Sequence, residues 1–251
     1  MKIIISPAKK MRADPDSLPW RELPEFLPRT EQLLARLRTM EYDELKKLWK
    51  CSDQIARQNV QRLQTMELRR GLTPALFAYD GIQYRYMAPD VFTDRELDYV
   101  QEHLHILSGF YGVLRPFDGV TPYRLEMQAK LSVNGEKDLY GFWSDSVAQT
   151  LWAQTDCVID LASREYSHCV PRRAGKRWIT CVFGEEKDGR IVEKGTQCKM
   201  ARGAMVRYLA ERQAQQPEPL KDFRELGYRY DAARSAADRY VFVKQKAGRK
   251  E

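Results

Sequence analysis

Short strand-like runs and longer helical patterns follow one another along this chain without regular alternation. Runs rich in β-branched and aromatic residues, which favour strands, lie at Lys2–Ile5, Cys157–Leu161, Arg177–Phe183, Arg190–Glu193 and Tyr240–Lys244. The third and fourth runs flank Glu185–Gly189, a polar turn sequence that predicts a β-hairpin. A doubly wound sheet needs regular strand–helix alternation, so we instead expect one mixed α/β domain of the α+β class over residues 1–251.

Four segments repeat apolar residues at helical spacing. The predicted helices begin near Thr30, after the N-cap Ser52, at Thr93 or Asp94, and at Asp138. We expect the third helix to continue through Leu107 and to end at the glycines that follow. We expect the fourth helix to run as far as Thr155.

No run in the sequence reaches the roughly 20 apolar residues that a membrane span requires. The apolar start Met1–Ile5 is interrupted by Ser6 and Pro7 too soon for a signal peptide. The hydrophobic fraction of 43% is that of a globular protein with a buried core. We therefore expect a protein of the cytoplasm that has no membrane partner.

The chain contains five cysteines and three histidines, and no two cysteines form a C-x-x-C pair. An odd number of cysteines in a reducing compartment argues against a disulfide framework. His103, His105 and His168 do not have the spacing of a zinc or haem site. We predict free thiols, no metal site and no cofactor.

Positive charge is concentrated in the last third of the chain. Residues 168–251 hold 20 Lys and Arg against 11 Asp and Glu, whereas the remainder holds 22 against 24. A localised basic surface favours a polyanionic partner. The alternative interpretation is a solvated helix face followed by a basic tail at about residues 244–251.

The sequence I-S-P-A-K-K directly follows the first predicted strand. A turn capped by Ser6, with Pro7 at its first helical position, would turn backbone N–H groups outward. Beside Lys9 and Lys10, these groups suit an anion or a phosphate. The S-x-x-K spacing also matches serine-lysine nucleophiles, although the companion motifs S-D-N and K-T-G are absent. Simple capping of the strand end is the third interpretation.

The segment L-S-G-F-Y-G-V-L-R-P, at residues 107–116, has two glycines three positions apart. A tight turn there would expose the backbone amides of Gly109 and Gly112 close to Arg115, which resembles the hairpin of a helix-hairpin-helix DNA-binding element. Pro116 would stop a second helix almost at once. A structural helix end followed by a turn explains the same residues equally well.

The segment K-M-A-R-G-A-M-V-R, at residues 199–207, is the strongest candidate site. On a helix, Lys199, Arg202 and Arg207 share one face, opposite an apolar face. A glycine inside a helix costs about 1 kcal/mol relative to alanine, so Gly203 indicates close approach of a ligand or of another backbone. Phosphate is the natural ligand for such a group of cations.

Two smaller clusters are P-Y-R-L-E-M at residues 122–127 and D-L-A-S-R-E-Y at residues 160–166. The second follows a predicted strand, and a cleft at the carboxyl end of that strand is expected to be lined by Ser163, Glu165 and Tyr166. Glu126 and Glu165 can act as an acid and a base. Equally, they can pair with Arg124 or Arg202 in a structural network.

Together these motifs resemble those of the YaaA family of bacterial peroxide-stress proteins. The matching motifs, in the family's order, are I-S-P-A-K, L-S-G-F-Y-G-V-L-R-P, P-Y-R-L-E-M, K-D-L-Y-x-F-W, D-L-A-S-x-E-Y and K-x-A-R-G-x-M-x-R. The resemblance implies a single domain with a family-specific fold and a basic cleft. It also implies binding of duplex or branched DNA through a helix-hairpin-helix-like element, and an association with lowering unincorporated intracellular iron during exposure to peroxide.

The motifs and the resemblance together define two groups of candidate residues. The candidate DNA- or phosphate-binding residues are Ser6, Lys9, Lys10, Gly109, Gly112, Arg115, Arg124, Lys199, Arg202, Gly203 and Arg207. The candidate cleft-lining residues are Tyr84, Glu126, Ser163, Glu165 and Tyr166. One segment, Ala78–Met87, keeps the family's glycine and Tyr84 but lacks the family's acidic residue after that glycine and its second glycine, which puts its ligand contact in doubt.

We therefore predict a peroxide-stress protein that binds DNA with weak sequence preference and is not a dedicated catalyst. The alternative is an enzyme that acts on a nucleotide or nucleic acid in the same cleft, through Ser6, Lys9, Glu165 and Tyr166. A direct iron chelator is disfavoured, because it would need clustered histidine, carboxylate or thiolate ligands.

Overall fold

A mixed β-sheet of eight strands runs through the molecule in the computed structural model, which describes residues 1–16 and 18–245. Five parallel strands form its centre, in the order β12 (Arg239–Lys244), β9 (Arg177–Lys187), β8 (Cys157–Leu161), β1 (Lys2–Ile5) and β5 (Leu104–Ser108). Three strands add antiparallel pairs: β11 (Tyr228–Tyr230), β10 (Arg190–Val192) and β6 (Gly112–Leu114). Because parallel strands are covered on both faces, Ile3, Ile4 and Ile5 of β1 are all completely buried.

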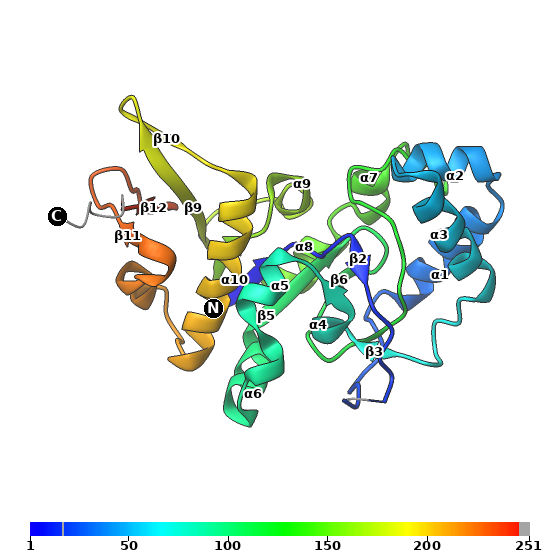
Figure 1. The fold of residues 1–251 in the computed structure, drawn as a ribbon, viewed down its shortest axis with the longest axis horizontal. Coiled ribbons are helices and arrows are strands. Elements are labelled where there is room, and N and C mark those ends of the chain that lie inside the picture. The colour runs from blue at the N-terminus through cyan, green and yellow to red at the C-terminus, as the bar shows by residue number, and fades with distance from the viewer. Residues whose placement is uncertain (17, 246–251) are drawn as a thin grey trace.

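Helices surround this sheet and extend the molecule at one end. Three of them, α1 (Leu27–Arg38), α2 (Tyr42–Trp49) and α3 (Asp53–Thr65), gather at the end opposite β9–β12 (Figure 1). The others are α4 (Ala75–Ala78), α5 (Ile82–Met87), α6 (Asp94–His103), α7 (Leu139–Trp143), α8 (Ser146–Ala153), α9 (Arg164–Ser167) and α10 (Gly195–Glu211). Short 3-10 helices cover Pro89–Val91, Glu218–Asp222 and Glu225–Gly227.

Two small two-stranded sheets complete the architecture. One pairs β2 (Lys10–Met11) with β4 (Tyr79–Asp80), and the other pairs β3 (Thr73–Pro74) with β7 (Gly119–Val120). The chain is thus a single mixed α/β domain, as the irregular mixing of strand and helix patterns predicted. Among the described helices the longest, α10, has 17 residues, and none combines the length and apolar character of a membrane span.

All five predicted strands are present, with small shifts at their ends. The strands at Lys2–Ile5 and Cys157–Leu161 have the predicted bounds. The predicted hairpin is confirmed as β9 and β10, which pair across a turn at Asp188 and Gly189. The predicted N-cap Ser52 precedes α3, and of the two predicted starts of the next helix, Thr93 and Asp94, α6 begins at Asp94. Thr93 is its N-cap, and the Thr93 hydroxyl accepts a hydrogen bond from the Glu96 backbone N–H.

Three local predictions were wrong. The third predicted helix ends at His103, and Leu104–Ser108 is strand β5 instead. The helix predicted from Asp138 to Thr155 is broken into α7 and α8 at Ser144, whose φ of 44° lies in the left-handed region. No helical turn follows β1, because residues 6–9 are irregular and lead into β2.

The connections of the central strands position a site. From β1 the chain crosses to β5 on one side, whereas β8, on the other side of β1, continues to β9. Adjacent parallel strands whose connections leave in opposite directions open a crevice beyond their carboxyl ends, where ligands of α/β sheets bind. That crevice lies beside Ser6 and Ser163, which follow the ends of β1 and β8.

Candidate functional site

A cavity of about 490 Å³ lies at the carboxyl ends of β1 and β8. It is lined by five segments that are distant in sequence and contribute residues 6–10, 80–84, 123–126, a group in 163–166, and two residues of α10. Eleven of the sixteen predicted site residues line this cavity, which we call the cleft: Ser6, Lys9, Lys10, Tyr84, Arg124, Glu126, Ser163, Glu165, Tyr166, Lys199 and Arg202.

Ser6 joins the two strand ends at the cleft. Its hydroxyl oxygen accepts a hydrogen bond from the Ser163 backbone N–H at 2.8 Å and lies 3.2 Å from the Ser163 hydroxyl. The Tyr84 hydroxyl donates to the Ser6 carbonyl at 3.1 Å. Lys9 does not complete a serine-lysine pair, since its Nζ lies 2.9 Å from the Glu126 carboxylate. These contacts assign Ser6 a capping role at the strand ends.

Two of the three carboxylates that line the cavity were predicted from the sequence. Glu126 pairs with Lys9 at 2.9 Å and with Arg124 at 3.7 Å. Glu165 accepts a hydrogen bond from the Gln128 backbone N–H at 3.2 Å. Burial, followed by the nearby charge of Glu126, raises the pKa of the Glu165 carboxyl above its ordinary value. The cleft therefore contains acidic groups as well as basic ones.

Several nitrogen atoms at the cleft are buried without a hydrogen-bond partner among the described residues. They are Nε of Arg124, Nε of Arg202 and the amide Nε2 of Gln83. No ion pair joins Arg202 to Glu126 or Glu165 in the described part of the chain, so of the two arginines considered for a structural network only Arg124 takes part. Because buried polar groups are almost always paired in folded proteins, these three atoms are candidate contacts for a ligand.

Lysines form the exposed rim of the cleft. The side chains of Lys9 and Lys10 are 66% and 75% exposed, and Lys199 is also exposed. Lys10 pairs with Asp80 at 2.6 Å, and hydrogen bonds from Lys10 and Arg85 lower the pKa of the Asp80 carboxyl. Such lysine ammonium groups are mobile point charges that can follow a bound anion.

Gly203 serves the packing of two helices rather than contact with a phosphate. A Cβ atom at this position would lie 2.0 Å from the Gln83 carbonyl oxygen and 2.9 Å from the Met87 backbone nitrogen. Both atoms belong to α5, so the backbones of α5 and α10 touch here. Of the two reasons predicted for this glycine, close approach of another backbone is confirmed.

Arg207, on the same helix, does not line the cleft. Its Nε pairs with Glu211 at 2.7 Å, one turn further along α10. Lys199 and Arg202 therefore contribute to the cavity without the third member of the predicted cationic face.

The predicted helix-hairpin-helix-like element is a β-hairpin of β5 and β6. A Cβ on Gly109 would lie 2.7 Å from the Leu125 carbonyl oxygen, and Gly112, with φ of 76°, packs against the Trp143 ring. Arg115 pairs with Asp118 at 3.2 Å and with Glu22. Gly109, Gly112 and Arg115 lie outside the lining of the cleft, and both glycines are buried by packing.

Sequence reasoning missed Gln83 and Asp80 of the cleft. Both lie in the segment 78–87 that departs from the family pattern. The glycine between them was the available signal, because a Cβ on Gly81 would lie 2.8 Å from Cβ of Ala8. This close approach brings the segment against the chain that follows β1.

Thiols and histidines do not gather into a site in the described residues. All five cysteines are free, and Cys169, Cys181 and Cys198 are buried. Within residues 1–16 and 18–245, no group of three or more histidine, cysteine, aspartate or glutamate side chains is arranged to hold a metal ion.

Comparisons with known proteins cover almost the entire chain. The sequence model of the family described as "Peroxide stress protein YaaA" matches residues 1–234. The chain is 50% identical over 249 residues to a UPF0246 protein of Desulfitobacterium hafniense, covering 98% of this chain and 99% of the relative. It is 49% identical over 246 residues to one of Lachnoclostridium phytofermentans (97% and 96%). It is 51% identical over 247 residues to one of Lactiplantibacillus plantarum (98% and 100%).

These matches agree with the resemblance drawn from the separate motifs. They span the strands, the helices and the cleft residues together, with few positions of any relative left uncovered. A family match of this extent connects the chain with the bacterial response to peroxide. The chain belongs to the YaaA family of peroxide stress proteins.

Proposed function

We propose that this protein acts in peroxide stress by binding DNA, duplex or branched, at the cleft, in the cytoplasm and with weak sequence preference. One observation carries the proposal: the guanidinium groups of Arg124 and Arg202 keep buried, unpartnered Nε atoms at a cavity rimmed by exposed lysines. Arginine forks and lysine point charges are the groups that bind phosphate. Phosphate contacts carry no base information, which accounts for weak sequence preference.

The proposal includes an association with low unincorporated iron, which the family resemblance implies. Direct chelation is not part of it, since the described residues offer no cluster of metal ligands. Protection of DNA at the cleft is compatible with an indirect effect on iron. Titration of the purified protein with ferrous iron, followed by calorimetry, is expected to give no stoichiometric binding.

Salt dependence of DNA affinity tests the proposal. Fluorescence anisotropy is measured with three duplexes of unrelated sequence and with a four-way junction. The three duplexes should bind with similar affinities. Affinity should fall steeply from about 50 to 200 mM salt, through counterion release. An affinity that is flat over this range, or that differs strongly among the three duplexes, would rule out binding through phosphates.

An enzyme acting on a nucleotide or nucleic acid is the second candidate. It is favoured by the carboxylates of Glu126 and Glu165 in one cavity, with the pKa of Glu165 raised by burial. A carboxyl with a raised pKa is a candidate general acid or base. Incubation with DNA and with free nucleotides, followed by chromatography, separates the candidates, because product formation supports the enzyme and binding without turnover supports the first proposal.

A further inference from the structure

We propose that the cleft holds one unpaired nucleotide, with its phosphate at the cationic rim and its base inside. This inference rests on the proposed DNA function and specifies which part of the DNA enters the protein. Four features of the cavity lead to it: mixed charge, an unpartnered buried amide, aromatic walls and a neighbouring second cavity.

The mixed charge of the cleft favours an occupant that is more than an anion. Lys199 and Arg202 attract a phosphate, but the carboxylates of Glu126 and Glu165 in the same cavity repel one. An occupant that satisfies both groups has an anionic end and an end rich in N–H donors. A nucleotide has this composition, because its base offers ring and exocyclic N–H groups to carboxylates.

Gln83 supplies complementary groups for the edge of a base. Its side chain lines the cleft, the residue is 6% exposed, and its amide nitrogen has no partner among the described residues. A primary amide donates and accepts in one plane, which matches the alternating donors and acceptors of a base edge. Contact of the Gln83 carbonyl with Gly203 fixes this residue beside α10.

The walls of the cleft suit a flat ring. Tyr84, Tyr123 and Tyr166 line it, and each is buried. Aromatic side chains stack on bases whatever their sequence. The volume of about 490 Å³ lies in the range of small-molecule sites. A base inside a paired duplex cannot reach such a cavity, so the occupant must be unpaired or extruded from the stack.

A second cavity borders the cleft at Arg202 and favours a nucleotide that belongs to a strand. It has a volume of about 630 Å³, shares Arg202 with the cleft, and is also lined by Arg164, Arg172 and Arg239. The adjoining phosphate of a strand would meet these arginines. A free mononucleotide would leave them unused.

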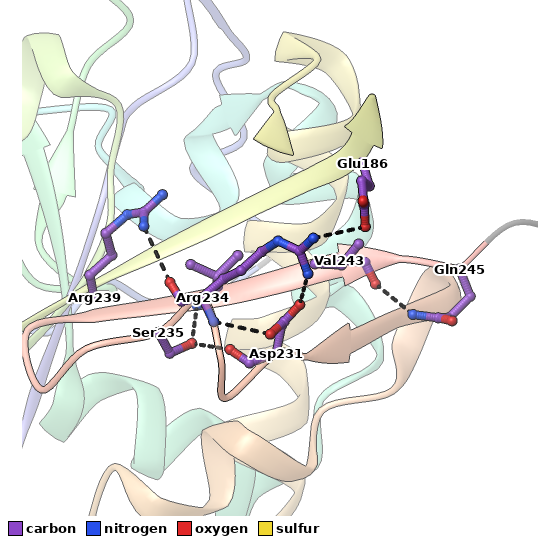
Figure 2. A network of polar contacts seen from close by, with 8 residues as sticks. Glu186, Asp231, Arg234, Ser235, Arg239, Val243 and Gln245 are labelled. Carbon is purple, nitrogen blue, oxygen red and sulfur yellow. Dashed lines mark hydrogen bonds and ion pairs between the residues drawn. The ribbon is translucent and has the colours of Figure 1, made fainter. Parts of the chain in front are cut away.

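Arg239, which lines this second cavity, joins a polar network (Figure 2). Its guanidinium donates to the Arg234 carbonyl at 3.3 Å. The Arg234 side chain in turn pairs with Asp231 at 2.6 Å and with Glu186 at 3.1 Å. The network links β9 to the loop between β11 and β12, and Arg239 joins it from β12.

Fluorescence of 2-aminopurine tests the proposal, because its emission reports stacking. The probe is placed in one duplex opposite thymine and in a matched duplex as a single-base bulge. We expect wild-type protein to bind the bulged duplex about tenfold more tightly than the paired one, the effect of roughly one extra hydrogen bond. Emission should change on binding of the bulged duplex only.

Two variants connect this preference to the cleft. Gln83→Leu should lose the tenfold advantage of the bulged duplex over the paired one. If Gln83→Leu does not fold, Glu165→Gln serves as the second variant. It preserves the shape of the side chain and should also reduce the preference for the bulged duplex. Circular dichroism and a melting curve establish folding of both variants, and Arg207→Ala is the control outside the cleft.

The outcomes separate this inference from the DNA proposal. If paired DNA binds but the bulge gives neither an advantage nor an emission change, the inference is overturned and the DNA proposal stands. If no DNA binds, the DNA proposal fails, and calorimetry with dAMP and dGMP then tests whether the protein binds a free nucleotide. Binding of a mononucleotide that Gln83→Leu abolishes would support a base pocket for free nucleotides, and absence of binding would reject it.

Discussion

Arg124 and Arg202 contribute the same chemical group to the cleft but in different states. Arg124 is 3.7 Å from Glu126, so part of its charge is already balanced. Arg202 has no ion pair in the described part of the chain, and its Nε is unpartnered. A bound phosphate would therefore gain most from Arg202. This difference makes Arg202 the most informative single residue for the proposed function.

Replacement of Arg202 by alanine should weaken DNA binding about equally for all sequences. The slope of log affinity against log salt should decrease by about one unit, as expected for one lost phosphate contact. The matched control is Arg207→Ala, on the same helix but outside the cleft and paired with Glu211, which should leave affinity near wild type. Anisotropy titrations at several salt concentrations measure both, and equal losses in the two variants would contradict a specific role of Arg202.

Asp160 should make the protein less stable as the pH rises from about 4 to 6. It is 5% exposed, and burial raises its pKa from 3.8 to about 6. The folded state therefore holds this proton more tightly than the unfolded state. The destabilisation is absent below the unfolded pKa, grows between the two values and is complete above pH 6.

Asp160→Asn removes this ionisation and keeps an oxygen for the hydrogen bond from the Ala162 backbone N–H. At pH 8 the variant should be more stable than wild type by up to about 3 kcal/mol, the equivalent of the pKa shift. The difference should vanish by about pH 4. Urea unfolding at a series of pH values measures it, and a constant difference across the series would show that Asp160 does not titrate as its burial implies.

At the scale of elements, the contact between α5 and α10 builds one side of the cleft. Gly203 allows the two backbones to touch, and this brings Gln83 and Arg202 to the same cavity. A glycine inside a helix is unfavourable by itself, so its presence here is explained by the close packing. The glycine thus affects the site through the position of α5 and not through contact with a ligand.

Gly203→Ala should lower the free energy of unfolding, although alanine is the better helix former. The added Cβ would meet the Gln83 carbonyl at 2.0 Å, and overpacking against backbone is expected to cost about 2 kcal/mol or more. Gly195→Ala is the control at the start of the same helix, where a Cβ meets nothing within 4 Å. Thermal melts should show a lower Tm only for Gly203→Ala, and an unchanged Tm would mean that the helices separate easily.

Elements with a distinctive local pattern were predictable, and those defined by burial were not. β1 and β8 are short apolar runs with clear ends, whereas β5 follows α6 without a break and continues its helical spacing through Leu104 and Leu107. Every residue of β5 is buried, so no alternation of polar and apolar residues distinguishes it from a buried helix. Gly109 and Gly112 were predicted to form an exposed DNA-binding hairpin. They lie instead at the buried turn between β5 and β6.

Cleft residues were predictable from chemistry, but their assembly depended on tertiary contacts. Charged and hydroxyl residues beside strand ends, such as Ser6 and Ser163, were identified because strand ends of a sheet bear sites. Gln83 was missed because an amide in a short helix has no local signal of function. Its role appears only where α5 meets α10.

At the scale of the whole molecule, the cations of the cleft come from other parts of the chain than the distribution of charge along the sequence indicates. The excess of Lys and Arg lies in residues 168–251, yet three of the five cations at the cleft come from the remainder. These are Lys9, Lys10 and Arg124, which join Lys199 and Arg202 from α10. The fold therefore brings together cations that lie far apart in the sequence. The distribution of net charge along the chain identifies only two of the five cations at the cleft. The predicted basic tail beyond residue 245 lies outside the described residues.

Burial protects three of the five thiols from reaction with peroxide. Cys169, Cys181 and Cys198 are buried, and burial raises the pKa of each thiol, in Cys169 to about 12. Since the thiolate is the form that hydrogen peroxide oxidises, these three residues should react far more slowly than a free cysteine. A role in peroxide stress would then depend on binding rather than on a thiol switch.

Treatment with hydrogen peroxide should therefore leave DNA affinity unchanged. We expect mass spectrometry, after exposure that fully oxidises free cysteine and subsequent alkylation in denaturant, to find Cys169, Cys181 and Cys198 still reduced. Any early oxidation should occur at the half-buried Cys51 or Cys157, and Cys51→Ser should bind DNA like wild type, because Cys51 does not line the cleft. Oxidation of a buried thiol together with a change in DNA affinity would show instead that the fold opens under peroxide and that the protein senses the oxidant directly.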